Sequence, residues 1–125
     1  MATLTMTNDN HDETVADGVV LIDFWAAWCG PCRQFAPVFE SMSESHPGLV
    51  FAKINTEQQQ EIAAHFQIRS IPTLMIFREQ IIVFSQPGSL PPAGLESIIE
   101  KVAALDMSEV RRQVAEQGTE QQGEA

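Results

Sequence analysis

This 125-residue chain has little cysteine, little basic charge and no tyrosine. Its two cysteines are too few for the disulfide framework of a small secreted domain. Seven basic residues against seventeen acidic ones give a formal net charge of −10, which argues against nucleic acid or an anionic membrane as a partner. No stretch approaches the roughly 18 apolar residues that span a bilayer, and residues 1–6 lack the basic start and apolar run of a signal peptide. We therefore expect a cytoplasmic protein that does not bind membranes.

The length and the apolar content of 44% fit one domain with a proper core and leave no room for a separate substrate domain. Apolar runs predict strands over the ranges 4–7, 19–26, 50–55, 73–77 and 81–85, the last two as an antiparallel hairpin. Helical spacing predicts helices over 31–45, 56–66 and from Leu95 to Leu105, and the polar segment 8–17 is expected to be partly helical.

The two cysteines, Cys29 and Cys32, are close enough in sequence to form and open one small-ring disulfide. They stand between a predicted buried strand and the start of a predicted helix. Unpaired backbone N–H groups and the helix dipole favour a thiolate there. Gly30 and Pro31 shape the loop, and proline fits a helix start because its missing N–H would be unpaired anyway. The pattern predicts a redox-active dithiol.

In a thiol-exchange cycle Cys29, placed first and expected to be more exposed, attacks a target disulfide, and Cys32 resolves the mixed disulfide. Cys32 then needs a base, and Asp23 is the candidate because burial in an apolar strand raises the proton affinity of a carboxylate. Lys53, an isolated cation in the strand 50–55, could pair with Asp23. The alternative is that Asp23 forms only local hydrogen bonds and Lys53 extends to solvent.

Two other interpretations of the cysteines are weaker. A zinc or iron–sulfur site needs further ligands, and the three histidines His11, His46 and His65 form no second paired motif, so we expect no metal. A purely structural disulfide that encloses two residues removes little chain entropy from the unfolded state.

Beyond the cysteine pair, four segments in order resemble the thioredoxin family, and together they cover about residues 4 to 105. They are Asp23-Phe24-Trp25-Ala26, Trp28-Cys29-Gly30-Pro31-Cys32, Phe51-Ala52-Lys53-Ile54-Asn55 and Ile68-Arg69-Ser70-Ile71-Pro72-Thr73-Leu74. A lone Cys-x-x-Cys is weak support, whereas four motifs at workable spacing make the resemblance specific.

The resemblance implies an α/β thioredoxin fold, with a central mixed sheet of four to five strands flanked by helices. It implies that Cys29 attacks, that Cys32 resolves, and that Asp23 and Lys53 form a buried acid–base pair. It also implies that Pro72 is a cis residue that leaves the backbone of Ile71 open to a substrate strand. The residues implied to form an apolar collar for disulfide-bearing client proteins are Trp28, Gly30, Pro31, Ile71 and Gly88.

The implied activity is that of a thiol–disulfide oxidoreductase that reduces protein disulfides without a bound cofactor. Electrons would come from NADPH through a thioredoxin reductase-type flavoenzyme, because this chain has no dinucleotide-binding glycine fingerprint. We expect a monomer. The chain departs from the family pattern at Ser70, where glycine is common, at the turn 78–81, which lacks Asn-Gly, and in the proline-rich segment 87–92. These departures bear on the choice of partner.

The thioredoxin-like domain is expected to span residues 1–105, and the chain continues past it. We expect an extra helix over 106–117, capped by Ser108, and a disordered tail over 118–125. Val110 and Val114 lie four residues apart and could dock on the domain or on a partner. One rival function is therefore a binding or chaperone-like module that uses this extension. Another is a dithiol oxidase or isomerase, against which the Gly-Pro pair between the cysteines argues.

Overall fold

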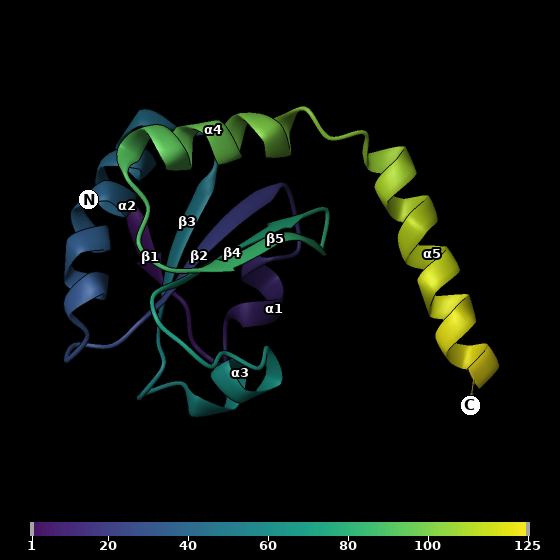
Figure 1. Ribbon diagram of the computed structural model, residues 1–125, viewed down its shortest axis with the longest axis horizontal. Helices are drawn as coiled ribbons and strands as arrows, with labels where there is room; N and C mark the ends of the chain where they lie inside the picture. Colours follow the sequence, from purple (N-terminus) through teal and green to yellow (C-terminus); the bar gives the residue numbers. More distant parts are fainter. Residues whose placement is uncertain (1, 125) are drawn as a thin grey trace.

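The computed structural model describes residues 2–124 and shows a five-stranded mixed sheet with helices on both faces, followed by a separate C-terminal helix (Figure 1). The strands are β1 (Thr3–Thr5), β2 (Val19–Trp25), β3 (Val50–Asn55), β4 (Thr73–Arg78) and β5 (Ile81–Pro87). The helices are α1 (His11–Thr14), α2 (Gly30–Ser45), α3 (Gln60–His65), α4 (Pro92–Ala103) and α5 (Met107–Glu124). The predicted α/β fold class is confirmed.

The sheet has the strand order β1-β3-β2-β4-β5. The strands β1, β3 and β2 run parallel, whereas β4 is antiparallel to β2 and β5 is antiparallel to β4. The carboxyl ends of the parallel neighbours β2 and β3 meet at one edge, where Trp25 is the register partner of Asn55. The cysteine loop follows β2 at this edge, so the ends of two buried strands support it.

The two faces of β2 build two separate cores. Val20, Ile22 and Phe24 pack in one cluster with Ile62 of α3, whereas Leu21 packs in the other with side chains of α2 and α4. Successive side chains of a strand point to opposite faces, so Asp23 shares the face of Leu21 and lies beneath α2. The same alternation places Lys53 on that face, because Phe51 belongs to the α2 cluster and Ala52 and Ile54 do not.

Several element boundaries differ from the prediction. β1 covers Thr3–Thr5 instead of 4–7. α3 begins at Gln60 instead of residue 56, because the side chain of Asn55 accepts hydrogen bonds from the N–H groups of Glu57 and Gln58 and forms a turn there. The β4–β5 hairpin turns through Glu79 and Gln80, which both have positive φ angles of 53° and 69° without being glycine.

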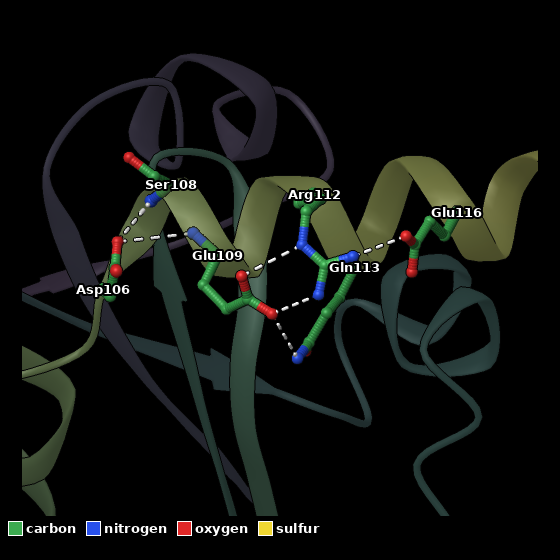
Figure 2. A network of polar contacts seen from close by, with 6 residues as sticks. All are labelled: Asp106, Ser108, Glu109, Arg112, Gln113 and Glu116. Atoms are coloured by element: carbon green, nitrogen blue, oxygen red, sulfur yellow. Dashed lines mark hydrogen bonds and ion pairs between the residues drawn. The ribbon is translucent and has the colours of Figure 1, made fainter.

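The C-terminal helix α5 runs away from the sheet after a short link from α4 (Figure 1). Its amino-terminal cap is Asp106, whose Oδ1 accepts from the N–H groups of Ser108 at 3.0 Å and Glu109 at 3.3 Å (Figure 2). The predicted cap at Ser108 is wrong because the aspartate precedes it and reaches both amides. Helix α5 extends to Glu124, past the end predicted at residue 117. The predicted disorder of residues 118–125 stays a prediction. Among the described residues, no helix combines the length and apolar character that crossing a membrane requires.

Candidate active site

The two cysteines form a disulfide at the start of α2, with their Cα atoms 5.2 Å apart. Cys29 is the N-cap residue of this helix, and its Sγ accepts a hydrogen bond from the backbone N–H of Cys32 at 3.2 Å. Pro31 occupies the first turn, as expected of a residue that has no N–H to leave unpaired. A sulfur that accepts a backbone N–H at a helix amino terminus is placed to be stabilised as a thiolate.

The loop before β4 lies against Cys29 on the other side. The Ile71–Pro72 peptide bond is cis, and the carbonyl oxygen of Ile71 is 3.6 Å from the Sγ of Cys29. Gly88, directly after β5 and with φ +106°, donates its N–H to the carbonyl oxygen of Pro72 at 2.8 Å. The hydroxyl of Thr73 donates to the carbonyl oxygen of Ser70 at 2.6 Å. These bonds hold the segment 70–73 beside the disulfide.

An open hollow of about 460 Å³ faces Cys29. Trp28 forms one wall, with 67% of the residue exposed, and its indole N–H donates to the carboxylate of Glu57. The sequence prediction named Trp28, Cys29, Gly30, Pro31 and Ile71, and all five line the hollow. The lining residues that it missed are Thr56, Ile68, Arg69 and Ser70.

Two signals could have found the missed residues. Thr56 follows β3, whose carboxyl end lies beside that of β2, and Arg69 and Ser70 directly precede the cis peptide. The other two residues predicted to bind clients, Pro72 and Gly88, are not among the residues that line the hollow, and the N–H of Gly88 donates to the carbonyl oxygen of Pro72.

Cys29 was expected to be more exposed than Cys32, but the accessible fractions of the two residues are nearly equal, 4% and 3%. They differ in what they face. Cys29 borders the open hollow, whereas Cys32 borders a smaller cavity of about 100 Å³ whose lining includes Trp25, Arg33 and Lys53. An incoming disulfide therefore has access to Cys29, and Cys32 faces inward.

Asp23 is fully buried in the centre of β2. Burial raises the pKa of its carboxyl to about 7, and the positive charge of Lys53 acts in the opposite direction with a smaller effect. Neither carboxyl oxygen has a hydrogen-bond partner among the described residues. A buried carboxyl with a pKa near neutrality can both accept and donate a proton at physiological pH.

Lys53 is the register partner of Asp23 on the adjacent parallel strand. Its ammonium group lies 5.0 Å from the centre of the Trp25 ring, a cation–π arrangement. In the described part of the chain Lys53 forms no ion pair with Asp23 within 4 Å. Lys53 therefore acts on Asp23 through its field and not through a direct bond.

The described residues contain no group of three or more His, Cys, Asp or Glu side chains that could hold a metal ion. What the site offers is a redox-active disulfide at a helix amino terminus, an open hollow beside Cys29 and, on β2, a buried carboxyl with a pKa near neutrality. This combination on a five-stranded mixed sheet defines a thiol–disulfide oxidoreductase.

Comparison with known proteins gives the family. The family model described as Thioredoxin matches residues 2–101. A Streptomyces coelicolor protein named "Putative thioredoxin 2" is 57% identical over 117 residues, which cover 93% of this chain and 87% of the relative. The thioredoxin of Alicyclobacillus acidocaldarius is 43% identical over 103 residues, 81% of this chain and 98% of that protein. The chain belongs to the thioredoxin family.

A solved structure agrees with this assignment. The crystal structure of Malassezia sympodialis thioredoxin (Mala s 13) superimposes with a TM-score of 0.70 at 34% identity, covering 79% of this chain and 89% of that one. The 117-residue match to the Streptomyces protein is longer than the whole stretch before α5, so it includes part of α5.

Proposed function

We propose that this protein reduces the disulfides of client proteins by dithiol–disulfide exchange, with Cys29 as the nucleophile and Cys32 as the resolving thiol. The observation that carries the proposal is the position of Cys29: it caps α2, accepts the N–H of Cys32 and borders the open hollow beside Ile71. The family supports disulfide-bearing proteins as the class of client.

In the first step the reduced protein presents Cys29 as a thiolate, stabilised by the N–H of Cys32 and by the amino terminus of α2. The thiolate attacks one sulfur of the client disulfide. A bond forms between Cys29 and that sulfur, the client S–S bond breaks, and the second client sulfur leaves as a thiolate that takes up a proton. The client is now held in a mixed disulfide.

In the second step Cys32 loses its proton and attacks the Sγ of Cys29. The disulfide between Cys29 and Cys32 re-forms, and the remaining client sulfur leaves as a thiolate and is protonated. We assign the acceptance of the Cys32 proton to Asp23, because its pKa of about 7 suits that transfer. The cavity bordered by Cys32 and Lys53 gives a small internal space near the resolving thiol. Two electrons and two protons pass to the client in the full cycle.

Client binding uses the walls of the hollow. The backbone N–H and C=O of Ile71 would pair with an extended client segment, and Trp28, Gly30 and Pro31 would contact its side chains. We assign Gly88 a supporting position, since its N–H holds the carbonyl of Pro72. A reductase of the flavoenzyme class that draws on NADPH would return the Cys29–Cys32 disulfide to the dithiol, and a reducing cytoplasm is the compartment that fits this cycle.

Reduction of insulin disulfides tests the proposal. Wild-type protein should reduce insulin with dithiothreitol as the electron source, and Cys29→Ser should fall to the rate of dithiothreitol alone. Wild-type activity no higher than that of Cys29→Ser would overturn the assignment. Rapid mixing of a preformed mixed disulfide then isolates the second step, where Asp23→Ala should resolve the intermediate more slowly; an equal rate would remove the role given to Asp23.

A binding or chaperone-like function through α5 is the second candidate, because 44% of Val114 is exposed on a helix that stands away from the sheet (Figure 1). Cys32→Ser traps clients as mixed disulfides, whereas a variant with both cysteines replaced by serine retains only clients bound by surface contacts. Covalent capture by the first variant and none by the second supports the reductase.

A further inference from the structure

The hollow beside Cys29 contains one charged side chain. Of the residues that line it, Trp28, Pro31, Ile68 and Ile71 are apolar, and those that remain are small, polar or the cysteine itself, except Arg69. Arg69 is exposed and lies two residues before Ile71, the residue that we expect to pair with the client backbone. A guanidinium group therefore borders the place where a client disulfide must sit.

The guanidinium of Arg69 has no partner within the described part of the chain. Most of the other basic side chains are engaged. Arg33 donates to the carbonyl oxygen of Ala27 at 2.9 Å, and Lys53 lies over Trp25. Arg78 donates to carbonyls at the end of α4, and Arg111 and Arg112 form ion pairs with glutamates. Lys101 on α4 is the other cation without a hydrogen bond or ion pair among these residues, and it lines a different pocket beside Val102 and Leu105.

We propose that Arg69 binds a carboxylate of the client next to the attacked disulfide, so that disulfide segments with a neighbouring Asp or Glu are preferred substrates. This inference rests on the proposed reductase function and specifies its substrate class. Guanidinium is suited to the task because its planar set of N–H donors can bind both oxygens of a carboxylate. An extended client advances ~3.3 Å per residue, so a carboxylate within about two residues of the cysteine lies within reach of Arg69.

The net charge of −10 acts against this preference, because the field of the whole protein attracts basic partners. Distance decides which effect dominates once the client is bound. The screening length is about 8 Å at physiological ionic strength, so acidic residues farther than this from the client are screened, whereas a guanidinium in contact with the client is not. The carboxylate of Glu57, which accepts the indole N–H of Trp28, is already engaged at the wall of the hollow.

Three disulfide peptides test the proposal: one sequence with Asp, Ser or Lys beside a cysteine, assayed at physiological ionic strength. The measured quantity is kcat/KM for each peptide relative to the Ser peptide, which cancels a general loss of activity in a variant. Wild-type protein should favour the Asp peptide over the Lys peptide about three- to fivefold, the range expected for an exposed ion pair. Arg69→Gln should reduce the ratio of kcat/KM for the Asp peptide to that for the Lys peptide towards one. Arg69→Lys should keep part of this Asp-to-Lys preference, and Arg69→Glu should invert it.

Lys101→Gln is the matched control, because it removes one unpaired cation that does not line the hollow, and it should keep the wild-type Asp-to-Lys ratio. The inference is overturned if Arg69→Glu and Lys101→Gln give the same ratio, or if wild-type protein does not distinguish the Asp and Lys peptides. Failure of the proposed function has a different signature: wild-type protein would then reduce none of the three peptides faster than Cys29→Ser.

Discussion

Asp23 and Lys53 are register partners on adjacent parallel strands, yet they form no hydrogen bond, and both carboxyl oxygens of Asp23 lack a partner among the described residues. The carboxyl is fully buried, so its ionised form is costly, and the cation beside it offsets only part of that cost. A sequence selected for stability alone would place an apolar residue at this position.

The first prediction concerns Asp23 and pH. Its pKa is about 7 in the folded protein, whereas an exposed aspartate has an ordinary pKa of 3.8, so the folded state holds this proton more tightly than the unfolded chain. The stability that the folded protein gains by holding this proton is fully present below the pKa of the unfolded chain and is lost as pH rises through about 7. A shift of this size corresponds to at most ~4 kcal/mol. Asp23→Ala should therefore be more stable than wild type at pH 8, and its advantage should shrink as pH falls towards 4.

Urea unfolding of the oxidised protein at several pH values measures this difference. Asp17→Ala is the control, because it removes an exposed carboxylate instead of a buried one. A constant difference between Asp23→Ala and wild type from pH 4 to pH 8 would contradict the prediction.

The second prediction concerns Arg78 at the end of β4. Its Nη1 donates to the carbonyl oxygens of Val102 at 2.7 Å and of Ala103 and Leu105 at 3.3 Å, at the carboxyl end of α4 and just beyond it. Arg78→Met keeps much of the aliphatic stem and removes these bonds, so it should destabilise the protein by about 1.5 kcal/mol in urea unfolding. Arg111→Met removes only an exposed ion pair with Glu79 and should cost less. Equal losses in the two variants would show that Arg78 does not cap α4.

The local sequence pattern predicts much of this site. The junction of β2 and α2 and the placement of both cysteines follow from apolar spacing and from one short motif, whereas the fold class rests on the resemblance of four segments to the thioredoxin family. Asp23 was found because a carboxylate in an apolar strand conflicts with its surroundings, and such conflicts occur at functional positions. The cis bond before Pro72 was expected only from the family resemblance.

Features that depend on distant contacts were not predicted. The position of Arg69 depends on a loop that returns to Cys29 from far along the chain. The hairpin turn has no glycine, and tertiary contacts hold it instead: the N–H of Glu79 donates to Gly18 at 3.1 Å, and the side chain of Gln80 donates to Ala16 at 3.0 Å. No pattern within the turn itself encodes these partners.

The third prediction concerns His11, another side chain whose surroundings the sequence did not reveal. Its ring packs against Phe66 and Phe77 at centroid distances of 5.3 Å and 6.1 Å, and its buried Nε2 has no hydrogen-bond partner among the described residues. A buried polar atom without a partner costs free energy, so His11→Leu should stabilise the protein by about 1 kcal/mol. Thermal and urea unfolding measure the gain. Asp12→Asn changes only the exposed carboxylate beside Nδ1 of His11 and should have little effect on stability. A loss of stability in His11→Leu, with none in Asp12→Asn, would contradict the prediction and show that the imidazole ring stabilises the fold.

The last prediction separates the parts of the C-terminal extension. Met107 at the start of α5 is 6% exposed, and Arg111 pairs with Glu79 of the hairpin, so the first turns of α5 contact the domain. Farther along, Arg112 pairs with Glu109 and Glu116 within α5 itself (Figure 2).

A chain ending at residue 106 loses the burial of Met107 and should be less stable by about 2 kcal/mol. A chain ending at residue 117 should keep the wild-type stability and the wild-type rate of insulin reduction, because we predict that 118–125 is disordered. Urea unfolding and hydrogen exchange check both truncations, and a measurable loss in the longer one would show that the final residues contribute to the fold.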